Sequence, residues 1–304
     1  MANRPNRELF EADSAAFLVK AIKDYVAKSP ANRFETFDSG RIFDEPLVGF
    51  ANGNDVIFQD YKEIIGDFHL TPWEVLAKHL ESKGGSQELP VVSVNSFILP
   101  ITYETRLSLR QETMIPSLRW NHTRWHGQDF INELSRYVVS LLESLDYRAV
   151  APELADFFKL KNLSSGYASN WSQRHVAYAA GLGTFSLNDG FITSRGMAMR
   201  CGSVVTDAKI QPTPRAYKDY LDNCLFYREG SCMRCAERCP AGAISEQGHD
   251  KNRCLEFLFT RQKEIVKELG REEGYIGRYL GCGLCQTKVP CEARIPPKKR
   301  GKRQ

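Results

Sequence analysis

Long apolar segments are absent from this sequence. Nowhere in its 304 residues do about eighteen apolar residues follow one another, which is the length that a membrane-spanning helix requires. Residues 1–13 are polar and charged, and they hold neither the apolar core of a secretory signal nor a twin-arginine pair. These absences predict a soluble protein without membrane contact, and we expect it in the reducing cytoplasm.

A strong charge of one sign is also absent. The formal net charge is +4, which is small for 304 residues and does not by itself indicate nucleic acid as a partner. The exception is residues 296–303, which read Pro-Pro-Lys-Lys-Arg-Gly-Lys-Arg. This basic tail is either a solvated chain end or an electrostatic contact to RNA, and the sequence leaves both interpretations open.

Cysteine, in contrast, is concentrated in one part of the chain. Eight of the nine cysteines lie between Cys224 and Cys291, and Cys201 is the ninth. Structural disulfides are rare in a reducing compartment, where clustered cysteines more often hold metal. The distribution therefore predicts a metal-binding region in the C-terminal third.

The rest of the chain alternates between helix and strand signals. Apolar periodicity predicts helices over residues 15–27 and 131–145, and a dense β-branched run predicts a buried strand over 91–101. Thr71 followed by Pro72 is typical of a helix N-terminus. Shorter signals follow: a strand at 147–150, and a helix–strand succession at 173–180 and 199–206. Such alternation favours a mixed α/β (or α+β) fold over an all-helical one.

A domain boundary is predicted at residues 208–216, which are polar and interrupted by two prolines. We therefore expect an N-terminal α/β domain for a cofactor or substrate over residues 1–215 and a cysteine-rich domain over 216–304. Within the first domain, residues 1–88 are expected to form a helical and mixed extension, and residues 89–215 the core.

The cysteine spacing is the most informative pattern. Cys232, Cys235 and Cys239 follow C-x2-C-x3-C-P, the latter part of the bacterial ferredoxin run. A C-x2-C turn points two thiolates at one centre, whereas the cysteine before the proline ligates the other cluster in two-cluster ferredoxins. Cys224 lies farther upstream than in that run, and Cys291 follows a proline, so the spacing predicts the number of ligands more directly than their partition.

Eight thiolates make two sites of four, with one cysteine exchanged between the halves. We expect one 4Fe–4S cluster on Cys224, Cys232, Cys235 and Cys291, and a second on Cys239, Cys254, Cys282 and Cys285. A helix is predicted to begin near Cys254 and to end near Gly270, and residues 241–244 fit a tight turn into a strand. Both features are typical of a ferredoxin-like module with two clusters.

Three other interpretations compete with iron–sulfur clusters. Two structural zinc sites use the same C-x2-C units, but zinc gives no reason for the Cys-Pro step. Disulfides disagree with the expected compartment. Ordinary buried cysteines do not explain eight thiols at these spacings.

Residues outside the cysteine region resemble a known group of enzymes. Ala180-Gly181-Leu182-Gly183 and the later Phe191-Ile192-Thr193 are similar to a glycine-rich core shared by reductive dehalogenases and epoxyqueuosine reductases. Residues 142–152 resemble the helix and strand that precede this core, and the order of the eight cysteines is that of both families. The resemblance covers roughly residues 130–295.

The resemblance implies a nitroreductase-like domain that holds cobalamin, followed by the ferredoxin-like domain. A ferredoxin or flavodoxin would donate electrons, and the reduced corrinoid would act on a small organic substrate by dehalogenation or by epoxide-type deoxygenation. The sequence departs from epoxyqueuosine reductases in two respects. Their helical-repeat region for tRNA has no counterpart after Cys291, and the position of their acidic proton donor falls near Tyr167.

Candidate residues follow from this resemblance. Tyr167 is the candidate proton donor, with a partly buried aromatic as the alternative. The candidate cofactor contacts are His175, Gly181, Leu182, Gly183, Thr184, Arg200 and Cys201. A structural histidine, a structural turn and a buried small side chain are the alternatives for His175, the glycines and Cys201. His122 and His126 have the spacing of a metal pair, but their flanking residues indicate a loop.

Three functions stay open at this point. The first is a cobalamin-dependent reductase of a small organic substrate. The second is an electron-transfer or corrinoid-reactivating protein without a substrate of its own. The third is a tRNA-modifying enzyme related to epoxyqueuosine reductases, which would use the basic tail.

Overall fold

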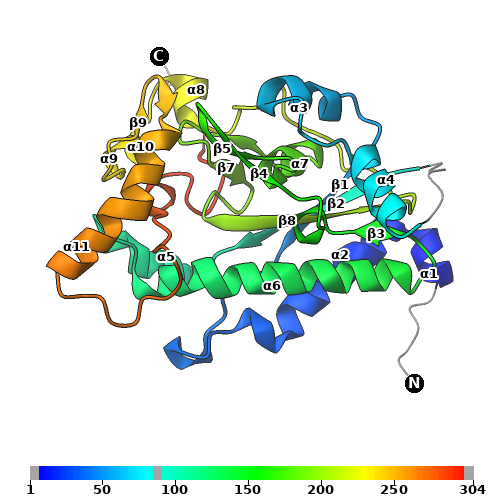
Figure 1. Cartoon of the computed structure of the whole chain (residues 1–304), viewed down its shortest axis with the longest axis horizontal. Helices are drawn as coiled ribbons and strands as arrows, with labels where there is room; N and C mark the ends of the chain where they lie inside the picture. Colours follow the sequence, from blue (N-terminus) through cyan, green and yellow to red (C-terminus); the bar gives the residue numbers. More distant parts are fainter. Residues whose placement is uncertain (1–6, 85–90, 298–304) are drawn as a thin grey trace, which may run out of the picture. The chain divides into compact units, whose positions relative to one another are not determined.

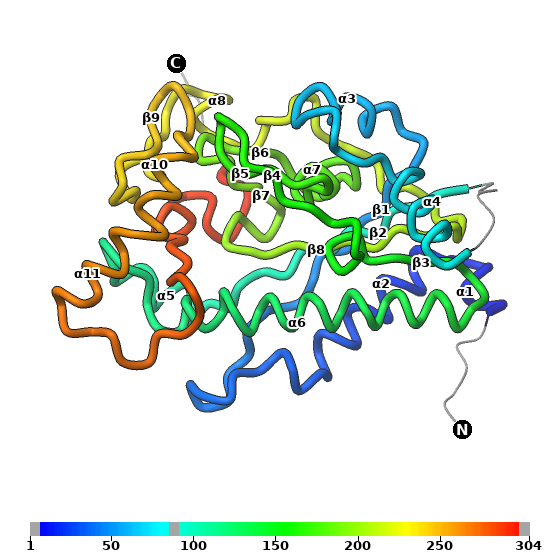
Figure 2. The backbone as a smooth tube through the Cα atoms, in the orientation of Figure 1, coloured from blue at the N-terminus to red at the C-terminus, as the bar shows by residue number. Residues whose placement is uncertain are grey.

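The structure, a computed structural model, describes residues 7–84 and 91–297. The chain forms two compact units, each assembled from separate stretches. Unit 1 contains the residues up to 99, 127–182 and 200–216, and unit 2 contains 100–126, 183–199 and the residues from 217 onward. Both units mix helices and strands (Figures 1 and 2), so the mixed α/β class is confirmed. The domain boundary near residue 216 stays a prediction.

Unit 1 is built around a four-stranded sheet. Its elements are α1 (Arg7–Ala12), α2 (Ser14–Lys28), β1 (Leu47–Asn52), α3 (Ile57–Ile65), α4 (Pro72–Ser82), β2 (Ser93–Pro100), the later part of α6 (Leu118–Glu143), β3 (Ala149–Val150), β4 (Leu160–Leu163), β5 (Gly166–Ser169), α7 (Gln173–Ala179) and β8 (Met199–Thr206). The helices predicted at 15–27, 131–145 and 173–180 and the strands predicted at 91–101, 147–150 and 199–206 are therefore confirmed.

The sheet has the order β1–β2–β8–β3. β1 pairs with β2, and β3 pairs with β8, and both pairs are antiparallel. Every residue of β2 is buried, the polar Ser93, Asn95 and Ser96 as well as the apolar ones, so this strand is covered on both faces. On one face Gly202 of β8 lies against Ile131 of α6, and on the other face Gly49 of β1 lies against the residues after α7. A Cβ atom at Gly49 would lie 2.5 Å from the Ala180 carbonyl oxygen, so this close helix–sheet approach requires glycine.

Local sequence signals explain how α4 begins. Thr71 accepts a hydrogen bond from the Glu74 backbone, and the Glu74 carboxylate accepts one from the Thr71 backbone, which completes a capping box. Pro72 occupies the first helical position, where no intrahelical N–H partner is needed. The predicted N-terminus is confirmed.

Unit 2 consists of shorter elements. They are α5 (Tyr103–Arg110), the first part of α6, β6 (Gly183–Phe185), β7 (Phe191–Thr193), α8 (Leu225–Glu229), α9 (Arg234–Glu237), β9 (Ile244–Ser245), β10 (Gly248–His249), α10 (Lys251–Glu256) and α11 (Gln262–Glu268). A π-helical turn over residues 257–261 joins α10 to α11, so the helix predicted near Cys254 is confirmed. The tight turn predicted at 241–244 also leads into a strand, β9.

One local prediction was wrong. The residues around His122 and His126 indicated a loop, but both histidines lie within helix α6. Tertiary contacts explain the difference: the Asn121 amide donates to the carbonyls of Ile276 and Leu280, and His122 Nε2 lies 2.8 Å from the Gly274 carbonyl oxygen. These bonds fix the segment as helix despite its polar residues and Gly127.

No helix within residues 7–84 and 91–297 is long and apolar enough to cross a membrane. The basic run from Lys298 to Arg303 lies outside the described residues.

A buried histidine network connects the elements of unit 1. His69 is fully buried, its ring stacks on Trp171, and its Nε2 atom accepts a hydrogen bond from the Ser172 backbone at 3.1 Å. Burial, together with the nearby Lys62 ammonium, lowers the pKa of His69 to about 4. The neutral ring is therefore the form that the folded chain holds.

This network predicts a pH dependence of stability. Because the unfolded imidazole binds a proton near pH 6.5 and the folded one does so only near pH 4, the contribution of His69 is complete above pH 6.5 and is lost as the pH falls towards 4. The wild-type free energy of unfolding should fall by about 2 kcal/mol between pH 7 and pH 5 through this group. His69→Gln keeps a hydrogen-bond acceptor but does not titrate. In this variant the fall of about 2 kcal/mol should be absent from the free energies of unfolding that chemical denaturation measures. Equal pH dependence in both proteins would contradict the assignment.

Candidate iron–sulfur site

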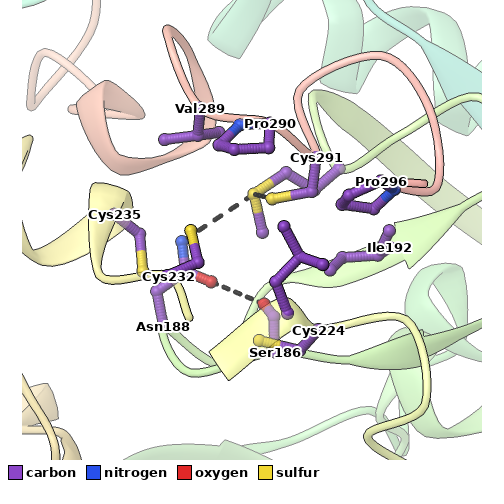
Figure 3. Close-up of a pocket in the computed structure, with 12 residues that line it drawn as sticks. Ser186, Asn188, Ile192, Cys224, Cys232, Cys235, Val289, Pro290, Cys291 and Pro296 are labelled. Atoms are coloured by element: carbon purple, nitrogen blue, oxygen red, sulfur yellow. Dashed lines mark hydrogen bonds between the residues drawn. The ribbon is translucent and has the colours of Figure 1, made fainter. Parts of the chain in front are cut away.

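Four cysteines from distant parts of unit 2 surround one pocket. Cys224 caps the start of α8, Cys235 lies in α9, and Cys232 and Cys291 come from the loops before α9 and near the chain end. Figure 3 shows these four side chains around the same space. The remaining lining is mostly apolar and comprises Ile192, Met197, Leu225, Val289, Pro290 and Pro296, with Ser186 and Asn188 as the polar members.

The Cys291 loop is fixed by β-like contacts to residues 197 and 198. The Met197 backbone N–H donates to the Cys291 carbonyl at 2.8 Å, and the Ala198 N–H donates to the Glu292 carbonyl at 3.1 Å. The Cys291 Sγ atom lies 3.5 Å from the Met197 sulfur. Gly196 is in the left-handed region, and a Cβ atom there would lie 2.3 Å from the Ala293 nitrogen. Glycine at this position therefore allows the two segments to approach.

The other four cluster candidates form a second group. Cys239 follows α9, Cys254 lies in α10, and Cys282 and Cys285 flank a sharp turn. Gly283 makes that turn with a φ of +67°, and a Cβ atom there would lie 2.2 Å from the Trp120 ring. The C-G-L-C sequence thus bends so that both of its thiols belong to the same group.

Electrostatics separates the cysteines into the same two groups. Burial, together with smaller contributions from Cys224 and Cys232, raises the pKa of Cys235 to about 12. Burial, together with smaller contributions from Cys254 and Cys239, likewise raises the pKa of Cys282 to about 12.

Cys291 and Cys285 repeat this division. The pKa of Cys291 is raised by burial and by the three other thiols of the pocket group, and that of Cys285 by burial and by the three other thiols of the second group. If all four thiols of a group are ionised, a cationic centre is therefore required to compensate their negative charge. An iron–sulfur cluster, which thiolates ligate, fits this donor set.

All nine cysteines are free thiols. Within residues 7–84 and 91–297, no three or more His, Cys, Asp or Glu side chains are placed around a single metal ion.

Polar side chains that the sequence did not reveal surround the second group. Asn188 Nδ2 donates to the Cys285 carbonyl at 3.1 Å, and Gln262 is fully buried beside Cys282. Burial lowers the pKa of His249, but hydrogen bonds to Asp189 and Cys254 raise it to about 9 overall. These residues come from separate segments, so no spacing signal could have identified them.

Glu292, next to Cys291, was also missed. Its carboxylate is 4% exposed and accepts hydrogen bonds from Arg110 at 2.6 Å, from Arg106 at 3.3 Å and from the Lys288 backbone at 2.7 Å. Both arginines lie on α5. The buried carboxylate therefore ties the Cys291 loop to this helix.

The cofactor candidates from the resemblance fall in both units. His175, in the first turn of α7, has its Nδ1 atom 2.8 Å from Ser172 Oγ, and its carbonyl accepts from Tyr61 at 2.7 Å. Gly181 adopts a φ of +72°. These two belong to unit 1 with Leu182, which is buried beside Gly49 of β1.

The other candidates have equally defined places. Arg200 bonds to the Gln128 side chain, and burial raises the pKa of Cys201 to about 12. In unit 2, Gly183 lies in β6, and Thr184 is buried and accepts from the Asn223 backbone at 2.9 Å. Tyr167 lies in β5, opposite Asn162 of β4, and is 53% exposed. Their roles stay predictions.

Glu292 yields a stability prediction. Glu292→Leu leaves two buried or partly buried arginines without their carboxylate, which typically costs about 3–5 kcal/mol. We expect this loss in the free energy of unfolding, together with reduced iron retention, because Cys291 is the neighbouring residue. The exposed Glu273→Leu serves as the control and should leave both quantities unchanged. A Glu292→Leu protein as stable as the control would contradict the role of this carboxylate.

Comparison with known proteins places the cysteine region in a defined family of domains. Residues 230–292 match the family model of the 4Fe-4S double cluster binding domain. The chain therefore contains such a domain, and the predicted iron–sulfur character is confirmed.

Sequence relatives extend the likeness beyond that domain. The chain is 34% identical over 122 residues to the epoxyqueuosine reductase of Bacillus cereus, covering 39% of this chain and 29% of that protein. It is 31% identical over 157 residues to the epoxyqueuosine reductase of Bacillus subtilis, covering 48% and 38%. The matches thus span less than half of these relatives. The resemblance to epoxyqueuosine reductases is confirmed over this part.

Solved structures give a weaker likeness. The structure of the Bacillus subtilis epoxyqueuosine reductase matches 93% of this chain and 69% of its own, at 18% identity and a TM-score of 0.47. A B12-dependent reductive dehalogenase matches 80% and 34%, at 14% identity and a TM-score of 0.44.

Proposed function

We propose that this chain, with its double cluster domain and its likeness to epoxyqueuosine reductases, is an iron–sulfur oxidoreductase that removes the oxygen of an epoxide on a modified tRNA nucleoside. The observation that carries the proposal is the gathering of eight thiols into two groups of four within unit 2. Among the reactions that the sequence left open, the names of the sequence relatives favour this one over dehalogenation.

The eight cysteines hold the two clusters in this proposal. Cys224, Cys232, Cys235 and Cys291 ligate the cluster at the pocket of Figure 3. Cys239, Cys254, Cys282 and Cys285 ligate the other cluster. Each cluster passes one electron at a time, and the deoxygenation of an epoxide to an alkene consumes two electrons and two protons and releases water. Two clusters that each carry one electron therefore supply the two electrons that the reaction consumes.

Cobalamin is the proposed second cofactor, on the basis of the family resemblance alone. When bound, it would supply a low-potential cobalt centre between the clusters and the substrate. The residues that would contact it are His175, Gly181, Leu182, Gly183, Thr184, Arg200 and Cys201. Tyr167, a half-exposed residue, would donate a proton to the substrate.

The partners follow from the same reaction. A ferredoxin or flavodoxin would supply single electrons, and the basic run after Pro297 would contribute to holding RNA phosphates. The cytoplasmic location remains a prediction.

The direct test of this function uses an RNA stem-loop that carries epoxyqueuosine. Anaerobically purified protein, supplied with cobalamin and a one-electron reductant, should convert the nucleoside to a product that has lost one oxygen, as detected by mass spectrometry. Omission of cobalamin should abolish the product. Full iron content without any conversion would contradict the enzyme and favour the electron-transfer protein.

Ligand assignment has a separate test. Cys239→Ser and Cys285→Ser should each lose about half of the bound iron, because each removes one of four ligands from the same cluster. Cys201→Ser, which changes the cysteine outside the two groups, should keep all of its iron. Unchanged iron in either cluster variant would overturn the eight-cysteine assignment.

Tyr167→Phe tests the proton donor. Removal of a general acid typically slows the chemical step about 10²- to 10⁴-fold, so product formation should fall by that order while iron content stays constant. The control is Tyr220→Phe, which removes the hydroxyl of a tyrosine exposed to a similar extent. An unaffected rate in Tyr167→Phe would exclude this residue as the donor.

A further inference from the structure

The two groups of thiols have different surroundings. N–H groups from several separate segments lie beside the second group. The Ala243 backbone N–H donates to the Cys239 sulfur at 3.3 Å, and the Asn188 amide donates to the Cys285 backbone carbonyl at 3.1 Å. The side chains of His249 and Gln262 lie beside Cys254 and Cys282.

The side-chain donors are themselves held in place. The oxygen of the Asn188 amide accepts a hydrogen bond from the Gly190 backbone at 3.0 Å, which directs its nitrogen towards Cys285. His249 lies 3.2 Å from the Asp189 carboxylate. Gln262 is fully buried and donates a long hydrogen bond, 3.4 Å, to the Met114 carbonyl, which leaves its second amide hydrogen for Cys282. These contacts hold the three side chains in place.

A positive charge lies beside the same group. The Arg238 guanidinium donates to the backbone carbonyls of Glu112 at 2.8 Å, Leu109 at 3.2 Å and Thr287 at 3.2 Å. These partners are neutral, so they position the guanidinium without cancelling its charge. Its electrostatic interactions are with Cys282 and Cys285 first, and with Glu292 after them.

The first group has a different environment. Its pocket is lined mainly by apolar side chains, with Ser186 and Asn188 as the polar members, and backbone N–H groups lie beside Cys235 and Cys291.

These differences act on reduction potential. Reduction adds one electron to a 4Fe–4S cluster, and hydrogen bonds to its sulfurs and nearby positive charge stabilise that more negative state. An apolar lining gives less such stabilisation.

We propose that the cluster held by Cys239, Cys254, Cys282 and Cys285 has the higher reduction potential and accepts the first electron. The cluster in the apolar pocket is then reduced second. This inference rests on the proposed assignment of the eight cysteines. A one-electron reductant supplies the electron and is itself oxidised, and the cluster passes from the 2+ to the 1+ state. No proton is required.

The test is an anaerobic reductive titration of the loaded full-length protein with dithionite, followed by electron paramagnetic resonance. The wild type should show two separate one-electron waves. In Arg238→Gln the higher-potential wave should move to lower potential while the other wave stays in place. Arg234→Gln is the matched control, because this arginine is four residues earlier, exposed and paired with Glu237. It should move neither wave.

Gln262→Leu provides a second variant in case the arginine change prevents folding. It removes one N–H donor from a buried site and should also lower only the higher-potential wave. A single two-electron wave in the wild type, or a shift of the lower-potential wave in these variants, would overturn the inference. Iron content separates the two proposals. About eight irons per chain, together with the opposite order of the two reduction waves, would reject this inference alone. Fewer irons per chain would reject the cysteine assignment on which it rests.

Discussion

The cost of burying thiolates governs unit 2. Burial raises the pKa of Cys235, Cys282, Cys285 and Cys291, and neighbouring thiols raise it further. Without a cation, these groups remain protonated, because four negative charges in a poorly solvated space repel one another. Iron–sulfur clusters reverse this balance by ligating the thiolates, and the free energy of ligation then becomes part of the free energy of folding. The short helices and two-residue strands of unit 2 are consistent with such dependence.

The same constraint explains how the ligand segments are built. Gly283 turns the chain between two cysteines, Gly196 allows the Cys291 loop to approach a neighbouring segment, and the Glu292 carboxylate fixes that loop to α5. Each of these features positions a segment of the chain that carries a cysteine. The polar and charged groups around one set of thiols, and the apolar lining around the other, then give chemically similar sites different electronic properties.

Much of the fold could be predicted from local signals. The Thr71-Pro72 start of α4 and the buried strand β2 are encoded within a few residues, because capping and β-branched runs act locally. The cysteine spacing likewise indicated the iron–sulfur character, since a Cys-Pro step after a C-x2-C turn is typical of two-cluster ferredoxins. His122 was misassigned because its helix is stabilised by residues about 150 positions away.

The supporting groups could not be predicted for a related reason. Asn188, Arg238, His249 and Gln262 are ordinary polar residues in the sequence, and their relation to the thiols arises only when separate segments fold together. In unit 1, His175 proved to be hydrogen-bonded, and Cys201 proved to be partly buried. Both features agree with a structural role as well as with a cofactor contact, and sequence pattern does not separate the two.

The measurement that tests this account most directly is the count of iron and acid-labile sulfide per chain in anaerobically purified wild-type protein. Two 4Fe–4S clusters predict about eight of each. About four of each would mean that one thiol group has another role. Zinc in place of iron, or iron without sulfide, would contradict the central claim that both groups of thiols hold clusters.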